Sequence, residues 1–136
     1  MRILLLFMLA VAAGAATRQP AITASDAWVA EPTAAGQTTA AAYLTVNNPT
    51  MYDIYLVSAT TDAAAKIEFR EGEGTAVKAV KDITVPSFGY AELKAGGVFL
   101  MLSDLKRPLN AGDTISLTVT TDGGIALVIA AAVKKP

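Results

Sequence analysis

The sequence predicts an antiparallel β-sandwich or barrel, and three observations carry that prediction. Short runs rich in Val, Ile, Thr, Tyr and Phe recur from Ile22 onward, between clusters of Gly, Pro, Asn and Asp that favour turns. Residues 114–120 alternate, with Ile115, Leu117 and Val119 on one face and hydroxyl side chains on the other, as a half-buried strand requires. No segment shows a convincing 3.6-residue period of an amphipathic helix.

The first element is an export signal. Met1 and Arg2 give a short positive start, residues 3–11 (ILLLFMLAV) are apolar, and residues 12–16 are small, which are the three parts of a cleavable secretory signal peptide. The apolar run is shorter than the roughly 20 residues that a membrane-spanning helix needs. We therefore expect residues 1–16 to be removed. The mature protein, residues 17–136, is expected to be one domain without a membrane span, periplasmic or secreted.

The mature domain is expected to contain about eight or nine strands, one at each apolar run that turn residues bound. The runs cover residues 22–29, 40–47, 52–60, 64–70, 76–85, 89–94, 98–103, 114–120 and 125–133. The turn sequences between them include Asn47-Asn48-Pro49 and Thr121-Asp122-Gly123-Gly124, whose residues tolerate left-handed or fixed backbone angles. No internal repeat or linker indicates a second domain.

The composition excludes several kinds of function. The 136 residues contain no cysteine and no histidine, which removes thiolate metal sites, disulfides and catalytic triads built on imidazole. Eleven Lys and Arg residues against twelve Asp and Glu give a formal net charge of -1, which gives no reason to expect a nucleic-acid partner. We therefore expect neither an enzyme nor a nucleic-acid-binding protein.

Two charged clusters are candidate sites, and each also has a plainer explanation. Glu68, Glu71 and Glu73 could work as acid and base or hold a cation, but their flanking charges and glycines are typical of the solvated end of a hairpin. Lys106-Arg107 and Lys134-Lys135 could form a basic ligand-binding patch, although such charges usually form a solvated rim.

Aromatic and thioether side chains supply two further candidates. Trp28 and Tyr43 lie on apolar strands, where large aromatic residues fill the core more often than they line a pocket. Met51 and Met101 are the methionines that remain after signal removal, and thioethers are soft ligands suited to Cu(I). A single methionine at a strand edge is more often a packing residue.

Four segments, taken in order, resemble the periplasmic copper chaperone family PCuAC. They are Asp26-Ala27-Trp28, residues 40–48 (AAAYLTVNN), residues 92–102 (ELKAGGVFLML) and residues 105–113 (LKRPLNAGD), and the resemblance spans roughly residues 22–133. It implies a cupredoxin-like antiparallel β-sandwich, export, and a lineage that serves copper homeostasis or the assembly of the CuA site of cytochrome c oxidase. It also implies a copper-site assembly partner or another periplasmic protein as the binding partner.

The resemblance further implies where copper ligands would lie. The family uses a His, methionines and a His-x-Met pair, a soft donor set suited to Cu(I). The first His falls on Arg70, the Met near it falls on Gly72, and the His of the pair falls on Phe99. If the family's spacing is kept, another Met falls on Val77, in a hairpin about four residues shorter than the family's. Met101 is the one retained ligand.

Three function classes follow from these substitutions. One thioether cannot hold copper against competing donors, so no cofactor is expected, and copper is the one metal that the lineage allows. The chain is either a copper-chaperone-family member with a degenerate or non-standard site, or a non-metal binding or assembly module on the same scaffold. Catalysis is the least favoured class, because His and Cys are absent.

Overall fold

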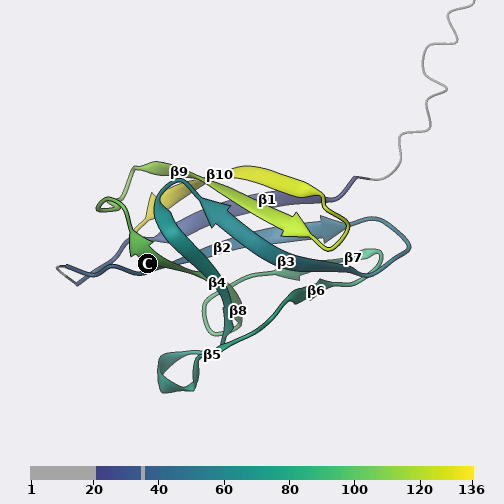
Figure 1. The fold of residues 1–136 in the computed structure, drawn as a ribbon, viewed down its shortest axis with the longest axis horizontal. Helices are drawn as coiled ribbons and strands as arrows, with labels where there is room; N and C mark the ends of the chain where they lie inside the picture. The colour runs from purple at the N-terminus through teal and green to yellow at the C-terminus, as the bar shows by residue number, and fades with distance from the viewer. Residues whose placement is uncertain (1–20, 35) are drawn as a thin grey trace, which may run out of the picture.

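The structure is a computed structural model that describes residues 21–34 and 36–136 (Figure 1). The described residues form β1 (Thr23–Ala30), β2 (Ala40–Asn48), β3 (Ile54–Thr61), β4 (Ala64–Glu71), the 3-10 turn η1 (Gly74–Ala76), β5 (Lys78–Ala79), β6 (Ile83–Val85), β7 (Gly89–Glu92), β8 (Val98–Leu105), β9 (Thr114–Thr121) and β10 (Ala126–Lys134). The predicted all-β class is therefore confirmed. The expected signal peptide, residues 1–16, lies outside the described residues.

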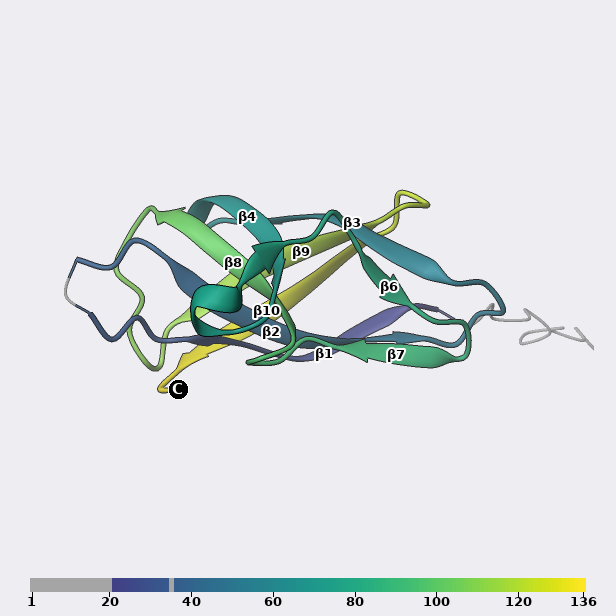
Figure 2. The ribbon, with the colours of Figure 1, turned by 90° about the horizontal axis from the view of Figure 1, so that it is seen from below.

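The strands form one hydrogen-bonded path that folds into a sandwich. The path runs β5-β4-β8-β2-β1-β10-β9-β3-β6, and β7 pairs with β2 off this path. β3 and β4 lie near opposite ends of the path, yet only Asp62 and Ala63 connect them. Because so short a connection spans roughly 10 Å, the spacing of two packed sheets, the path must fold back on itself. Figure 2 shows β3 and β4 along one side of the molecule and β1, β2 and β7 along the other.

The pairing is antiparallel, as predicted, except between β1 and β10. These two strands are parallel, with Trp28 opposite Ala132 and Ala30 opposite Lys134. A parallel pair needs a long crossover connection, and here the rest of the domain supplies it. Local turn signals report only on strands that follow one another, so they do not reveal a pairing between the first and last strands.

The strand predicted over residues 76–85 is in fact three short elements. Ala76 ends η1, β5 pairs with β4, and β6 pairs with β3 at the other end of the path. The chain therefore crosses between the two layers after Val80, whose N–H donates to the carbonyl of Phe69 at 2.9 Å. A strand that changes layers cannot be continuous. The apolar spacing from Val80 to Ile83 breaks the two-residue period at this crossing.

The apolar core lies between the layers and includes Leu44 in β2, Leu100 and Leu102 in β8, and Leu117 in β9. The predicted alternation of β9 is confirmed, because the apolar residues of that strand are buried. The described residues contain no helix long and apolar enough to cross a membrane.

Candidate functional site

The residues at the implied copper-ligand positions lie mainly on the outer face of β4 and β8. Arg70 lies directly opposite Phe99, and Glu68 lies directly opposite Met101. Directly opposed side chains point to the same face of a sheet, and residues two apart on a strand share that face. The structure therefore brings Arg70, Phe99 and Met101 together, on the face away from the core residue Leu100.

Phe99 continues an aromatic row across three strands. Its ring centroid is 6.3 Å from that of Tyr43 in β2, and the Tyr43 centroid is 4.8 Å from that of Trp28 in β1. Phe99 is 6% exposed and Tyr43 is 9% exposed, although neither belongs to the core cluster between the layers. We call Trp28, Tyr43 and Phe99 the aromatic row. Phe99 thus has a packing role at the position where the resemblance places a histidine.

Arg70 extends this row onto β4 and carries a fixed positive charge. Its Nη2 donates to Oε2 of Glu68 at 2.8 Å, and Nζ of Lys66 lies 2.6 Å from Oε1 of Glu68. The hydrogen bonds from Lys66 and then Arg70 hold the pKa of the Glu68 carboxyl below its usual value. Nε of Arg70 is buried and has no hydrogen-bond partner among the described residues. A permanent guanidinium at this place repels a metal cation.

The tip of the hairpin between β4 and β5 leaves no room for a ligand at Gly72. Gly72 has φ +110°, and a Cβ atom added there would lie 2.8 Å from the carbonyl oxygen of Ala76. The same Cβ would lie 3.4 Å from Cα of Val77, so Val77 lies beside Gly72 just beyond the last strand pair, Glu71 with Lys78. Gly72 is four residues beyond the level of Met101 along β4, roughly 13 Å in a strand. Val77 and Met101 therefore stand at opposite ends of the candidate site.

The alternative ligand combinations do not come together. Met101 lies opposite Ala41, and β2 runs on for seven more residues to Asn48 before the turn that carries Met51. Seven strand residues span roughly 23 Å, so the two thioethers cannot share one ion. In the part of the chain that the structure describes, no group of three or more Asp, Glu, His or Cys side chains could hold a metal. Glu68, Glu71 and Glu73 do not form such a group.

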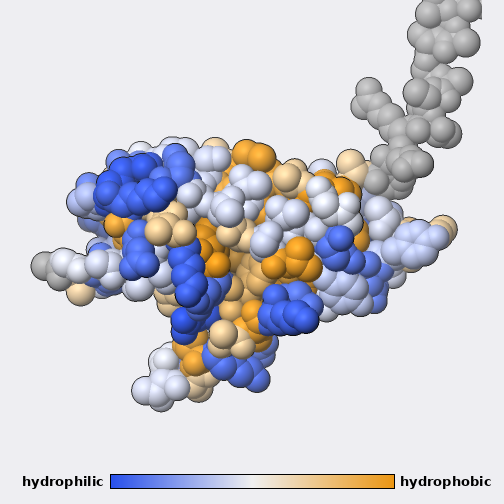
Figure 3. Space-filling view, viewed as in Figure 1, coloured by the Kyte–Doolittle hydropathy of each residue, from blue (hydrophilic) through white to orange (hydrophobic). Residues whose placement is uncertain are grey.

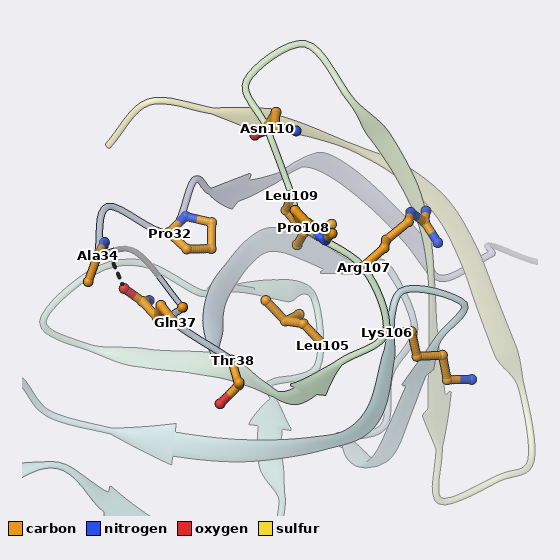
Figure 4. Close-up of a pocket in the computed structure, with 11 residues that line it drawn as sticks. Pro32, Ala34, Gln37, Thr38, Leu105, Lys106, Arg107, Pro108, Leu109 and Asn110 are labelled. Atoms are coloured by element: carbon orange, nitrogen blue, oxygen red, sulfur yellow. Dashed lines mark hydrogen bonds between the residues drawn. The ribbon is translucent and has the colours of Figure 1, made fainter.

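Two residues of the predicted basic patch, Lys106 and Arg107, do not point into the cavity beside them. A cavity of about 480 Å³ is lined by residues 32, 34, 36–38 and 105–110 (Figure 4). Figure 4 shows Lys106 and Arg107 extending away from the space that Leu105 and Pro32 border. Nη2 of Arg107 lies 3.9 Å from Oδ2 of Asp62, and both side chains are about half exposed. Lys134 and Lys135, at and after the end of β10, are exposed.

Sequence reasoning missed a second cavity, of about 310 Å³, beside the aromatic row. Its lining includes Trp28 and Tyr43, which were candidate pocket residues, together with Asp26 and Glu92, which carried only the family resemblance. Asp26 lies at a break in the pairing of β1 with β2, between Ser25 and Trp28. Simple alternation places Asp26 and Trp28 on one face, but the break changes the register at this point, and no sequence pattern brings Glu92 of β7 beside them.

Comparison with known proteins shows the family. The family model described as "Putative lipoprotein LpqE-like" matches residues 22–133. "Putative lipoprotein Lxx21020" from Leifsonia xyli subsp. xyli is 34% identical over 115 residues, which are 81% of this chain and 68% of that protein. The solution structure of CuI-DR1885 from Deinococcus radiodurans is 32% identical, covers 90% of this chain and 83% of that chain, and has a TM-score of 0.70.

A further solved structure gives the fold. The copper-bound PCuAC domain from PmoF2 is 22% identical, covers 85% of this chain and 93% of that chain, and has a TM-score of 0.73. The resemblance to PCuAC and the cupredoxin-like sandwich that it implied are thereby confirmed. The chain belongs to the LpqE-like family and is built on the β-sandwich of the PCuAC copper chaperones.

Proposed function

We propose that this protein is an exported member of the copper-chaperone lineage whose copper-site positions no longer hold Cu(I) tightly. The relatives support the lineage, since one is described in its CuI form and another as copper-bound. The observation that carries the loss of the site is the direct opposition of Arg70 and Phe99, with Met101 next along β8. The copper-homeostasis or CuA-assembly role of the lineage would then depend on ligands that a partner protein supplies.

Charge repulsion and the small number of ligand atoms both favour weak binding of Cu(I). Two unit charges about 5 Å apart repel by about 3 kcal/mol at an effective dielectric constant of about 20. An ion held by Met101 would meet this repulsion from Arg70, while the Phe99 ring offers no lone pair. We therefore expect Met101 alone to give weak binding that a competing chelator removes.

Export is part of the proposal. The family and the Leifsonia relative are named lipoproteins, which supports export of this chain as well. A bacterial lipoprotein carries its lipid on a cysteine at the cleavage point, and these 136 residues contain none. We therefore propose release by cleavage near Ala15 or Ala16. The intact mass of the protein recovered from the cell envelope tests this, and a mass that includes residues 3–11 would contradict it.

Competition against a chromogenic Cu(I) chelator tests the copper-site proposal. The wild-type mature domain is expected to lose Cu(I) to the chelator, whereas Arg70→His with Phe99→His should compete better, because two imidazoles then stand beside Met101. Adding Met101→Leu to that double variant should reduce the gain, and Glu71→His with Val98→His, a pair also directly opposed, is the matched control. Tight stoichiometric binding by the wild type would refute the proposal.

A second candidate, a non-metal binding or assembly module, is favoured by one exposed surface. Met51, Tyr52, Phe88 and Tyr90 are 62% to 75% exposed; the first three lie in turns, and Tyr90 lies at the start of β7. Aromatic side chains and Met are enriched at protein interfaces. This candidate predicts that Phe88→Ser with Tyr52→Ser abolishes rescue of a deletion strain while Met101→Leu does not. The copper candidate predicts the reverse.

A further inference from the structure

The cavity of about 310 Å³ lies at a gap in the strand pairing along β2, away from the positions implied for copper. β8 pairs with β2 as far as Ala42, and β7 takes over the same edge from Thr45. Across the gap, the N–H of Leu93 donates to the carbonyl of Leu44 at 2.8 Å. The side chains that line the gap include Asp26, Trp28, Tyr43, Thr45, Glu92 and Lys94. Its volume lies at the lower end of the range for small-molecule sites, roughly 300–1,000 Å³.

Two rings of the aromatic row form a corner of this cavity. Trp28 and Tyr43 have centroids 4.8 Å apart and ring planes inclined by 43°, so the two faces diverge. Tyr43 is 9% exposed, so most of its ring is shielded from water. Burial raises the pKa of the Tyr43 hydroxyl, which keeps the ring neutral. The cavity wall thus contains two electron-rich aromatic rings and a neutral hydroxyl group.

Carboxylates lie on both sides of the aromatic corner. Asp26 comes from β1 and Glu92 from β7, which pair with opposite edges of β2 around Thr45. Asp26 has φ +54°, a left-handed conformation that few residues other than glycine adopt without cost. Lys94 is the one cation in the lining, and its stem lies against Gly97, with Cγ 3.5 Å from the position of an added Cβ. The lining charges therefore sum to one negative charge.

We propose that this cavity binds a small organic cation that carries a methylated ammonium group, of the choline type. Aromatic faces attract such cations through their quadrupoles, and the attraction is strongest where water is partly excluded. The two carboxylates add charge complementarity. A metal ion fits less well, because no group of three ligating side chains forms among the described residues, and an anion would be repelled. The proposal is independent of copper.

Trp28 provides a direct readout, because it is the one tryptophan in the chain. The mature domain is titrated with choline chloride while its tryptophan fluorescence is recorded, with sodium chloride at equal ionic strength and dimethylbutanol, the uncharged carbon isostere of choline, in parallel. We expect a saturable change with choline alone. An equal response to dimethylbutanol would show an apolar pocket without charge selection, and an equal response to sodium chloride would show a salt effect. Either result, or no response at all, would overturn the proposal.

Isosteric variants test the role of the carboxylates. Asp26→Asn and Glu92→Gln should each weaken choline binding about tenfold, the equivalent of about 1.4 kcal/mol. Asparagine also tolerates the left-handed conformation of Asp26, so the variant should fold. Glu71→Gln removes an exposed carboxylate outside the cavity and should leave choline binding unchanged. Thermal melts check that all three variants are folded, and unchanged choline affinity in folded Asp26→Asn and Glu92→Gln would refute the assignment.

Discussion

At the scale of single residues, the Asn48 side chain links the turn after β2 to the turn after β6 through hydrogen bonds. Its side chain is fully buried, and Nδ2 donates to the carbonyls of Tyr52, Val85 and Pro86 at 2.8, 3.1 and 3.2 Å. Its Oδ1 accepts from the N–H and the hydroxyl of Thr50 at 3.0 and 2.6 Å. One amide group thus bonds backbone atoms of its own turn and a carbonyl 37 residues further along the chain.

Asn48→Ala is expected to lower the free energy of unfolding by about 2–4 kcal/mol, because it leaves several buried carbonyls without a donor. Urea unfolding of the mature domain measures the change. Asn47→Ala is the matched control, since Asn47 is the exposed neighbour on the same strand, and its effect should stay within about 0.5 kcal/mol. Equal losses in the two variants would show that the Asn48 hydrogen bonds are not the source of the stability.

Glu68 makes the stability of the folded protein depend on pH. Its pKa is lowered in the folded protein, so its stabilising contribution is complete above the unfolded value of about 4.5 and is lost as pH falls through the lower folded value. We therefore expect the melting temperature of Glu68→Gln to fall below that of the wild type at pH 7. The two proteins should converge at a pH well below 4. A constant difference at both pH values would contradict the ionic origin.

At the scale of elements, the hairpin between β4 and β5 decides which ligands the candidate site can gain. The carbonyl of Ala76 closes the space above Gly72, and Val77 lies beside Gly72. We expect Arg70→His, Phe99→His and Val77→Met together to bind Cu(I) more tightly than the wild type. The same triple variant with about four residues inserted in the hairpin should bind more tightly still, because ligand geometry must be met as well as ligand identity. Chelator competition measures the order, and equal affinities with and without the insertion would show that hairpin length is not limiting.

Elements with a clean local signal could be predicted from the sequence, and elements that depend on distant partners could not. β9 alternates without interruption, so its strand and its buried face were both predicted correctly. Residues 76–85 were predicted as one strand because their composition favours strands. In the structure this segment crosses from one layer to the other, because β5 pairs with β4 and β6 pairs with β3. Local sequence does not report those pairings. The parallel pairing of β1 with β10 has the same origin.

The residues of the candidate site also fall into those that the sequence could place and those that it could not. The shared face of Arg70, Phe99 and Met101 follows from alternation once β4 and β8 are paired. The family resemblance implied that these positions belong to one site, but no sequence pattern predicted the pairing of the two strands. Glu92 could not be placed beside Asp26 and Trp28, because the pairing of β7 with β2 puts it there and no local pattern reports that pairing. The role of Met101 as a copper ligand stays a prediction.

At the scale of the whole molecule, stability comes from the apolar core between the layers, which draws residues from both ends of the chain. Because this core needs no cross-link, we expect the mature domain to fold without metal. Its melting temperature should be the same with and without a chelator. A fall of several degrees on chelation would reveal a metal that contributes to folding.

The strand path ends in β5 and β6, which are two and three residues long. Long unpaired strand edges are templates for aggregation, and very short terminal strands remove that template. β5 covers only Arg70 and Glu71 at the edge of β4, and because it is two residues long it offers little template for a further strand. Lengthening the hairpin to admit another copper ligand would extend this edge, so the variant that regains copper should also be the one that precipitates first at high concentration.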